Sequence, residues 1–357
     1  MAMNQHAYRE NHSTETALIQ LTDDCLRNME NGLLTGVALL DFSAAFDLVD
    51  HDLLLLKLKD YNFSEGAINW IKSYLTGRIS MVNINREFLV HRKLSVDYSI
   101  TLYADDSTPY HVEENVNLIS ENLHNDLLNV EEWIRKNRLV LNVEKTKSIL
   151  IGGRQRIKVA HPLNLSMKNK SITQYSCVKL LGVQMDEALS WKPHCDGLLK
   201  DCSKALGLLY RFSKYIPKAA LRSIADALIL SKLNYCCTVW GSALNRNSLD
   251  FLQILQNKVA RLIVGCKIHE KSRKELHNEL NWLTVRQRIH MRTAMIIHRT
   301  LYWKEPFTIY LCNFILSSLP MNMRQDPHRS VKVISYYLRN LFIRRKHFLL
   351  ERLPEEE

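Results

Sequence analysis

The chain has 357 residues, 46% of them hydrophobic, so it is long enough for two or three domains and too apolar for global disorder. It contains no run of 18 uninterrupted apolar residues, which excludes a conventional membrane-spanning helix. The opening MAMNQHAYRE lacks the apolar core of a signal peptide, so we expect a protein that is not secreted.

The charge is unevenly distributed along the chain. Lys and Arg number 48 against 37 Asp and Glu, which gives a net charge of +11. Residues 1–130 carry a net charge of −10, whereas residues 131–357 carry +21. This division suggests a carboxylate-rich region followed by a surface that binds a polyanion. A basic protein with an uneven surface would give the same count, so charge alone leaves nucleic-acid binding open.

Hydrophobic periodicity predicts mixed helices and strands up to about residue 186 and helices beyond it. The predicted strands cover 35–41, 98–103, a second strand after a tight turn at 104–107, then 148–151, 163–167 and 178–185. The predicted helices cover 13–32, 49–59, 66–75, 114–137, 196–213, 218–235, 247–264 and 284–303. Ser13 is expected to cap the first helix and Gly32 to end it.

The eight cysteines do not form a metal-binding pattern. None lies in a CxxC pair, and no Cys/His set has the spacing of a zinc finger. Buried, reduced thiols in an intracellular protein are therefore the default expectation.

Two acidic segments are candidates for chemistry. Asp41 ends the apolar strand of ALLDFSAAFD, and Asp105 and Asp106 form an adjacent pair in LYADDST. Adjacent carboxylates repel each other unless a cation lies between them, and Mg²⁺ is a common solution. Asp-Asp pairs also occur on plain helix surfaces, as at Asp23-Asp24, so the pair alone does not establish a metal site.

Seven segments in a fixed order carry a much more specific signal. They are LDFSAAFDLVDHDLLLLKL, IKSYLTGR, YADDST, KNRLVLNVEKTKSILIG, VKLLGVQMDEALSW, LNYCCTVWG and LQNKVARLIVGC. The series resembles the reverse transcriptases of non-LTR (LINE-type) retrotransposons, over about residues 5–300.

The resemblance implies an α+β fold of the right-hand polymerase type, followed by an all-helical region. It implies a fingers remnant at 1–34, a palm with a small antiparallel sheet at 35–186 and a helical thumb or connection region at 187–303. Separately, the weaker periodicity near the C-terminus predicts a weakly ordered tail at 304–357. The implied activity is RNA-directed DNA polymerisation, with an RNA template, a DNA primer and dNTPs as partners. A nuclear or cytoplasmic location follows, without membrane attachment.

Roles for individual residues follow from the same resemblance. Asp41, Asp105 and Asp106 would bind two Mg²⁺ ions and act as the catalytic triad, and Lys145 would protonate the leaving pyrophosphate. Phe46 would stack under the incoming sugar, and Leu181 with Gly182 would form a primer grip. Considered alone, Phe46 is also a plausible core aromatic residue, and Lys145 a solvated loop lysine.

One segment typical of the family is missing. Members carry a G-(V/I)-P-Q-G-S loop and an apolar helix between the TGR and YADD motifs. Here Asp41 and Asp105 are 64 positions apart, and Pro109 is the only Gly or Pro between Arg78 and Ile151. We therefore predict an internal deletion near residues 85–98 and no polymerase activity. A non-catalytic nucleic-acid-binding remnant and an incomplete gene model are the alternatives.

Pro109 would also remove a hydrogen bond from the strand after the Asp pair.

Overall fold

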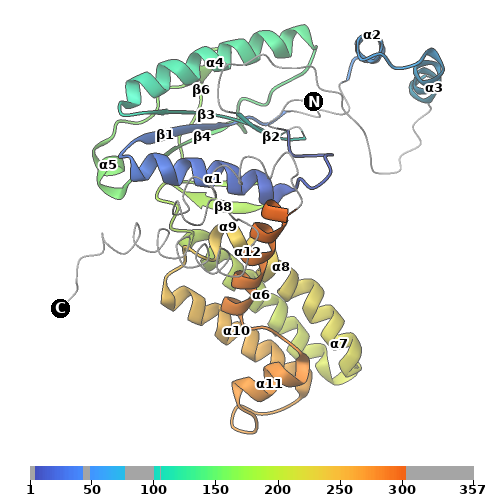
Figure 1. The fold of residues 1–357 in the computed structure, drawn as a ribbon, viewed down its shortest axis with the longest axis vertical. Helices are drawn as coiled ribbons and strands as arrows, with labels where there is room; N and C mark the ends of the chain where they lie inside the picture. Colours follow the sequence, from blue (N-terminus) through green and yellow to red (C-terminus); the bar gives the residue numbers. More distant parts are fainter. Residues whose placement is uncertain (1–4, 43–48, 77–99, 105, 303–357) are drawn as a thin grey trace. The chain divides into compact units, whose positions relative to one another are not determined.

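The computed structural model describes residues 5–42, 49–76, 100–104 and 106–302 (Figure 1). Within these ranges the chain divides into two compact units. The sheet unit comprises residues 5–8 and 31–176, and the helical unit comprises residues 9–30 and 177–302. The predicted deletion near 85–98 and the predicted tail at 304–357 lie outside the described residues.

The sheet unit is built on four antiparallel strands in the order β2-β3-β1-β4. These are β1 (Leu34–Leu39), β2 (Ile100–Tyr103), β3 (Asp106–Glu113) and β4 (Lys147–Ile151). The central strand β1 is an almost continuously buried run, which is why the apolar segment before Asp41 forms a strand.

The long helix α4 (Val116–Lys136) packs on one face of this sheet (Figure 1). Its buried residues recur every three or four positions, as expected for an amphipathic helix. Gly36 on β1 allows the close approach, because a Cβ atom there would lie 2.3 Å from Cγ2 of Ile119. The resulting core includes Leu34, Ala38, Ile119, Leu123, Leu127, Leu150 and Leu165.

Five smaller elements complete the sheet unit. Asp50 caps α2, its carboxylate accepting a hydrogen bond from the Leu53 amide at 2.9 Å, and Ser64 caps α3 in the same way. The five elements are α2 (His51–Asp60), α3 (Glu65–Leu75), α5 (Arg154–Val159) and the short pair β5 (Ser166–Met167) and β6 (Lys170–Ser171).

The helical unit combines helix α1 with a two-stranded hairpin and the later helices. The hairpin strands are β7 (Cys177–Leu180) and β8 (Val183–Asp186). Its helices are α1 (Thr14–Glu30), α6 (Lys192–Phe212), α7 (Lys218–Ala225), α8 (Ser231–Asn234), α9 (Cys237–Trp240), α10 (Arg246–Val264), α11 (Arg273–Leu280) and α12 (Val285–Tyr302). The 3₁₀ turn η1 (Ser213–Tyr215) and the π-helical turn η2 (Asp226–Leu230) connect some of them.

The structure corrects four of the predicted elements. The strand predicted at 178–185 is a hairpin of two short strands, because the chain turns at Leu181 and Gly182. The turn predicted at 104–107 is shorter, because Asp106 and Ser107 already belong to β3. The helix predicted at 218–235 is interrupted by the π-helical turn and ends at Asn234. The strand predicted at 163–167 is reduced to Ser166–Met167.

At the level of fold class the prediction is confirmed, since a small antiparallel sheet with helices precedes a largely helical region. The boundaries assigned to fingers, palm and thumb stay predictions. No helix among the described residues has the length and hydropathy needed to span a membrane.

Candidate active site

Two of the three predicted carboxylates lie beside one β-bridge: Asp41 follows Leu40 beyond the end of β1, and Asp106 begins β3. Beyond β1, the Leu40 amide donates to the Ser107 carbonyl at 3.0 Å, and the two residues form a bridge. This bridge has the same register as the β1–β3 pairing, and that register, continued by one pair, would set Asp41 opposite Asp106. Residues opposite each other in antiparallel strands project from the same face, so this register would bring two hard oxygen donors together.

The turn before Asp106 is a tight two-residue connection. Tyr103 pairs with Asp106, so only Ala104 and Asp105 connect β2 to β3. Ala104 has a positive φ of 56°, which is uncommon for a residue with a Cβ atom and typical of a hairpin turn. Asp105 itself lies outside the described residues.

A residue that the sequence did not single out holds this turn. The Gln5 side chain accepts a hydrogen bond from the Ala104 amide at 3.2 Å and donates one to the Ala104 carbonyl at 3.4 Å. The Gln5 carboxamide oxygen also accepts from the Ala7 amide at 2.9 Å, and Gln5 is buried. Gln5 therefore fixes both backbone groups of the residue that precedes the Asp pair.

Lys145 lies on a turn that is attached to Asp41. The Asn142 amide donates to the Asp41 carbonyl at 2.8 Å, beside a bridge between Phe42 and Leu141. The side-chain oxygen of Asn142 accepts from the Lys145 amide at 3.2 Å. Asn142 thus links the backbones of a predicted metal ligand and the predicted proton donor, and the Lys145 side chain is exposed.

The predicted metal site is only partly described. No three Asp, Glu, His or Cys side chains gather as a metal-binding group within the described ranges, and these ranges omit Asp105. Phe46 also lies outside the described residues. The carboxylate oxygens of Asp41 and Asp106 are of the kind that a hard cation such as Mg²⁺ prefers. Because Asp105 lies outside the described residues, the triad stays a prediction.

The predicted primer-grip residues form the tip of the hairpin in the helical unit. Leu181 and Gly182 connect β7 to β8 with positive φ angles of 45° and 83°. A pair of positive φ angles is the mark of a type I′ turn, in which glycine is favoured. The tip is partly accessible, with Gly182 exposed and Leu181 half-buried.

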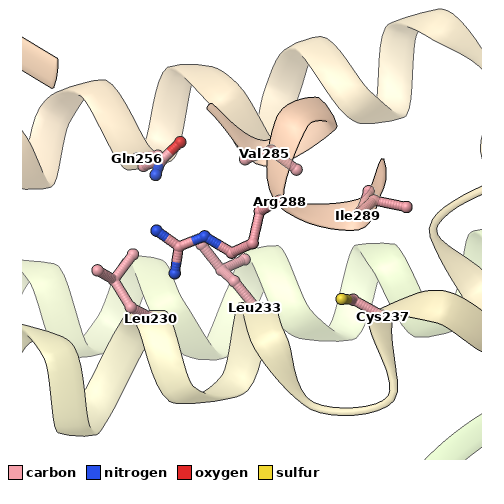
Figure 2. A pocket seen from close by; sticks show the side chains of 7 residues that line it. All are labelled: Leu230, Leu233, Cys237, Gln256, Val285, Arg288 and Ile289. Carbon is pink, nitrogen blue, oxygen red and sulfur yellow. The ribbon is translucent and has the colours of Figure 1, made fainter. Parts of the chain in front are cut away.

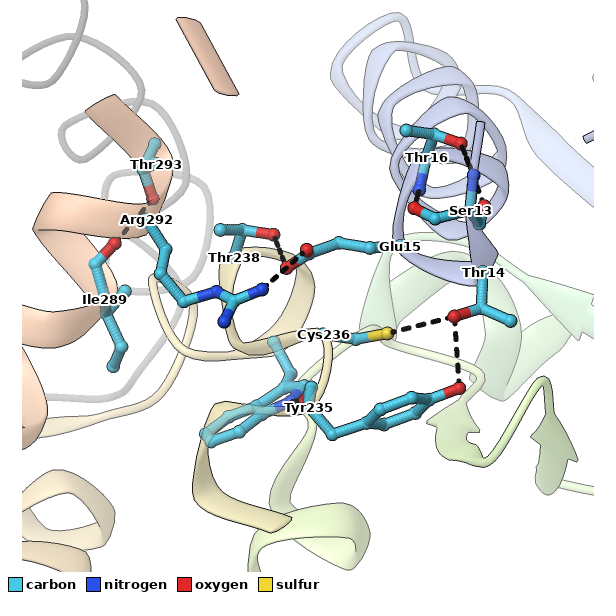
Figure 3. A network of polar contacts seen from close by, with 11 residues as sticks. Ser13, Thr14, Glu15, Thr16, Tyr235, Cys236, Thr238, Ile289, Arg292 and Thr293 are labelled. Carbon is cyan, nitrogen blue, oxygen red and sulfur yellow. Dashed lines mark hydrogen bonds and ion pairs between the residues drawn. The ribbon is translucent and has the colours of Figure 1, made fainter. Parts of the chain in front are cut away.

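A polar network surrounds the start of α1 in the same unit (Figure 3). Glu15 accepts a hydrogen bond from Thr238 at 2.6 Å and forms an ion pair with Arg292 at 3.2 Å. Thr14 Oγ1 lies 3.2 Å from the Tyr235 hydroxyl. The network attaches α1 to α9 and α12, over more than 220 positions of sequence.

Four buried cysteines of the helical unit are poorly reactive thiols. Burial raises the pKa of Cys195, Cys202 and Cys236 to about 11 and that of Cys237 to about 12. A thiol with such a pKa holds its proton at neutral pH and is a poor nucleophile. The expectation of buried thiols is confirmed for these four residues and for Cys25, whereas Cys177 and Cys266 are only half-buried.

A small cavity lies between α8, α9, α10 and α12 (Figure 2). Its lining is mainly apolar, and the Arg288 guanidinium enters it and donates to Asn234 Oδ1 at 3.0 Å. Burial lowers the pKa of Arg288. The cavity volume of about 10 Å³ is on the scale of one water molecule, so it does not admit a nucleotide.

Comparison with known proteins gives a consistent result. The chain is 24% identical over 327 residues to a probable RNA-directed DNA polymerase from transposon BS of Drosophila melanogaster, covering 82% of this chain and 35% of that protein. It is 22% identical over 323 residues to the corresponding protein of the X-element from the same organism, with the same coverage. A Pol polyprotein from the type-1 retrotransposable element R1 of Bradysia coprophila is 24% identical, covering 78% of this chain and 30% of that protein.

No protein-family model matches the chain. The chain spans about a third of the length of the curated relatives it matches. The relatives nevertheless come from four different transposable elements, and all are RNA-directed DNA polymerases or Pol polyproteins. Each match covers at least 75% of the chain. The resemblance indicated by the ordered motifs is therefore confirmed: along most of its length, this chain is similar to the reverse transcriptases of non-LTR retrotransposons.

Proposed function

We propose that the chain is a reverse-transcriptase-like protein that binds an RNA template and a DNA primer but does not polymerise DNA. The bridge between Leu40 and Ser107 supports the first part, because its register, continued by one pair, would set Asp41 opposite Asp106. The similarity to RNA-directed DNA polymerases of transposable elements supports it.

In the intact parent enzyme, the residues at the positions of Asp41, Asp105 and Asp106 would hold two Mg²⁺ ions, which would activate a primer 3′-hydroxyl and stabilise the leaving pyrophosphate. In that parent, Phe46 would stack under the incoming sugar and Lys145 would supply a proton to the pyrophosphate, whereas the primer contact of Leu181 and Gly182 would remain in this chain. The link from Asp41 through Asn142 to Lys145 supports the placement of that lysine beside the carboxylates.

The missing glycine- and proline-bearing segment argues against activity in this chain. In the family it supports the template base and the incoming nucleotide, and 64 positions separate Asp41 from Asp105 here. Binding of nucleic acid does not require that pocket, because phosphate contacts from a basic surface supply most of the affinity. The +21 net charge of residues 131–357 supports the binding function.

Primer extension with Mg²⁺ on a primed RNA template tests the proposal. We expect no template-dependent product from the purified chain, at enzyme concentrations that give clear binding of the same duplex. Synthesis by the wild-type chain that disappears in the Asp105→Asn variant would overturn the proposed inactivity. It would instead support an active RNA-directed DNA polymerase. Sequencing the transcript between the codons for residues 85 and 98 distinguishes an incomplete gene model, which predicts a skipped segment encoding GxPQGS.

The binding function is tested separately by titrating a labelled primer–template duplex at several salt concentrations. We expect the logarithm of the association constant to fall linearly with the logarithm of the salt concentration. Affinity that does not change with salt, or no binding at low salt, would contradict it.

A further inference from the structure

The tip of the β7–β8 hairpin is held in place by one aromatic side chain. The Tyr235 hydroxyl donates a hydrogen bond to the Leu181 carbonyl at 2.8 Å. The ring lies against the next residue, since a Cβ atom on Gly182 would be 3.1 Å from Cε1 of Tyr235. Tyr235 therefore contacts both residues of the turn, 53 or more positions away in the sequence.

Tyr235 is itself anchored. Its amide donates to the Ser231 carbonyl at 3.0 Å, and the Trp240 indole Nε1 donates to its carbonyl at 2.9 Å. Its hydroxyl also lies 3.2 Å from Thr14 Oγ1 (Figure 3). The ring is thus tied to α8, α9 and α1, while 41% of the residue stays exposed.

A second attachment restrains strand β8. The Gln184 amide lies 3.4 Å from His194 Nδ1, which accepts its hydrogen bond, and the His194 ring meets the Trp240 ring edge-on at 5.3 Å. Trp240 is the same residue that holds the Tyr235 carbonyl. The hairpin is therefore fixed at its tip and along one strand by neighbouring groups.

The chemistry of the tip fits a sugar–phosphate backbone. Gly182 is exposed and has no side chain, so a strand can approach its backbone closely. Lys179 pairs with Gln184 on the strand leading to the turn, and both side chains are exposed. A cation beside an accessible backbone turn matches the needs of phosphate binding.

We propose that Tyr235 is a positioning residue for nucleic-acid binding, which holds the backbone of Leu181 and Gly182 in the conformation that contacts the primer strand. This inference rests on the proposed function, in which the two residues form the primer contact. Tyr235 affects primer binding by fixing the conformation of the turn and does not itself contact the primer. Its hydroxyl is the decisive group, because the hydrogen bond to Leu181 sets the orientation of the turn.

The test uses the full chain and the Tyr235→Phe variant, which keeps the ring and removes the hydroxyl. Tyr215→Phe is the matched control, because Tyr215 lies in the same unit and is 83% exposed. Affinity for a labelled RNA–DNA primer–template duplex is measured by fluorescence anisotropy at several salt concentrations. Hydrogen exchange at the amides of Gly182 and Val183 reports on the turn.

We expect Tyr235→Phe to bind about three- to tenfold more weakly, the range that one lost hydrogen bond produces. The salt dependence should keep its slope, because the phosphate contacts themselves are unchanged. Exchange at Gly182 and Val183 should be faster, and Tyr215→Phe should match the wild type in both measurements.

Two results would overturn the inference while the proposed function stands. One is equal duplex affinity in Tyr235→Phe and wild type. The other is a loss of affinity that is fully explained by a larger fraction of unfolded variant protein. Failure of the wild-type chain to bind the duplex at low salt would instead refute the proposed function, and the inference with it. A Gly182→Ala variant, strained at φ 83° and crowded against Tyr235, should weaken binding in the same way through the turn itself.

Discussion

Leu40 and Ser107 pair across β1 and β3 after a gap of two residue pairs. The register is continuous from Leu34 opposite Glu113 to Val37 opposite Tyr110, and it resumes at Leu40. Pro109, which has no amide hydrogen, lies in the gap. Hydrogen-bonded pairs alternate in antiparallel strands, so the missing donor is the one that would face Ala38. The hydrogen bond that the sequence predicts to be missing at Pro109 is therefore the one to Ala38.

Replacing Pro109 by threonine should restore this donor. We expect the Pro109→Thr variant to gain a protected amide at position 109 and to raise the free energy of unfolding by up to about 1 kcal/mol. The gain is partly offset because proline also restricts the unfolded chain. Hydrogen exchange and urea denaturation measure the two effects. An amide at position 109 that exchanges as fast as a loop amide would contradict the prediction.

Gly36 should be intolerant of any side chain. In Gly36→Ala the new Cβ atom would meet Ile119 Cγ2 at 2.3 Å and Leu123 Cδ1 at 3.0 Å, so α4 must shift away from the sheet. Overpacking of this kind costs about 1–3 kcal/mol, measurable by urea denaturation. Gly66→Ala is the control, because nothing lies within 4 Å of a Cβ atom there. A stability equal to that of the wild type would show that α4 does not pack against β1 in this way.

The sequence predicts well what depends on local patterns. The spacing of Ile119, Leu123 and Leu127 determines α4, and the apolar run before Asp41 determines β1. The sequence pattern sets the start of β3 too late, because the tight turn at Ala104 brings Asp106 into the strand.

The supports of the candidate site could not be predicted in this way. Gln5 contacts Ala104 across 99 positions, and Tyr235 contacts Leu181 across 54. Such contacts leave no periodic signal in the sequence, because only the fold brings the partners together. The π-helical turn at Asp226–Leu230 is similar, since its residues fit an ordinary helical pattern.

Gln5 should control the conformation of the turn before Asp106. In Gln5→Ala the Ala104 amide loses its acceptor, so we expect its hydrogen exchange to accelerate about tenfold, the effect of about 1.4 kcal/mol. If the carboxylates bind a divalent cation, Mn²⁺ affinity measured by electron paramagnetic resonance should fall as well. Gln155→Ala, at an exposed position on α5, is the control. Unchanged exchange at Ala104 would rule out this role for Gln5.

His194 should make the stability of the helical unit depend on pH. Burial lowers its pKa from 6.5 to about 4, and its Nε2 atom is buried without a hydrogen-bond partner. Between pH 6.5 and 4 the unfolded state therefore binds more protons than the folded state, so stability is fully present above pH 6.5 and falls as the pH is lowered. Since one unit of pKa is worth about 1.4 kcal/mol, the total loss is about 3 kcal/mol.

Other groups titrate in the same range, including His277 and His290, whose pKa values are also lowered by burial. The measurement is therefore a difference: urea denaturation of wild type and His194→Gln at intervals from pH 7 to pH 4. The variant should be less stable at pH 7, because it loses the packing of the ring against Trp240, and it should lose less stability on acidification. His269→Gln, at an exposed position of the same unit, should follow the wild-type curve. Parallel curves for wild type and His194→Gln would show that His194 is accessible to protons in the folded state.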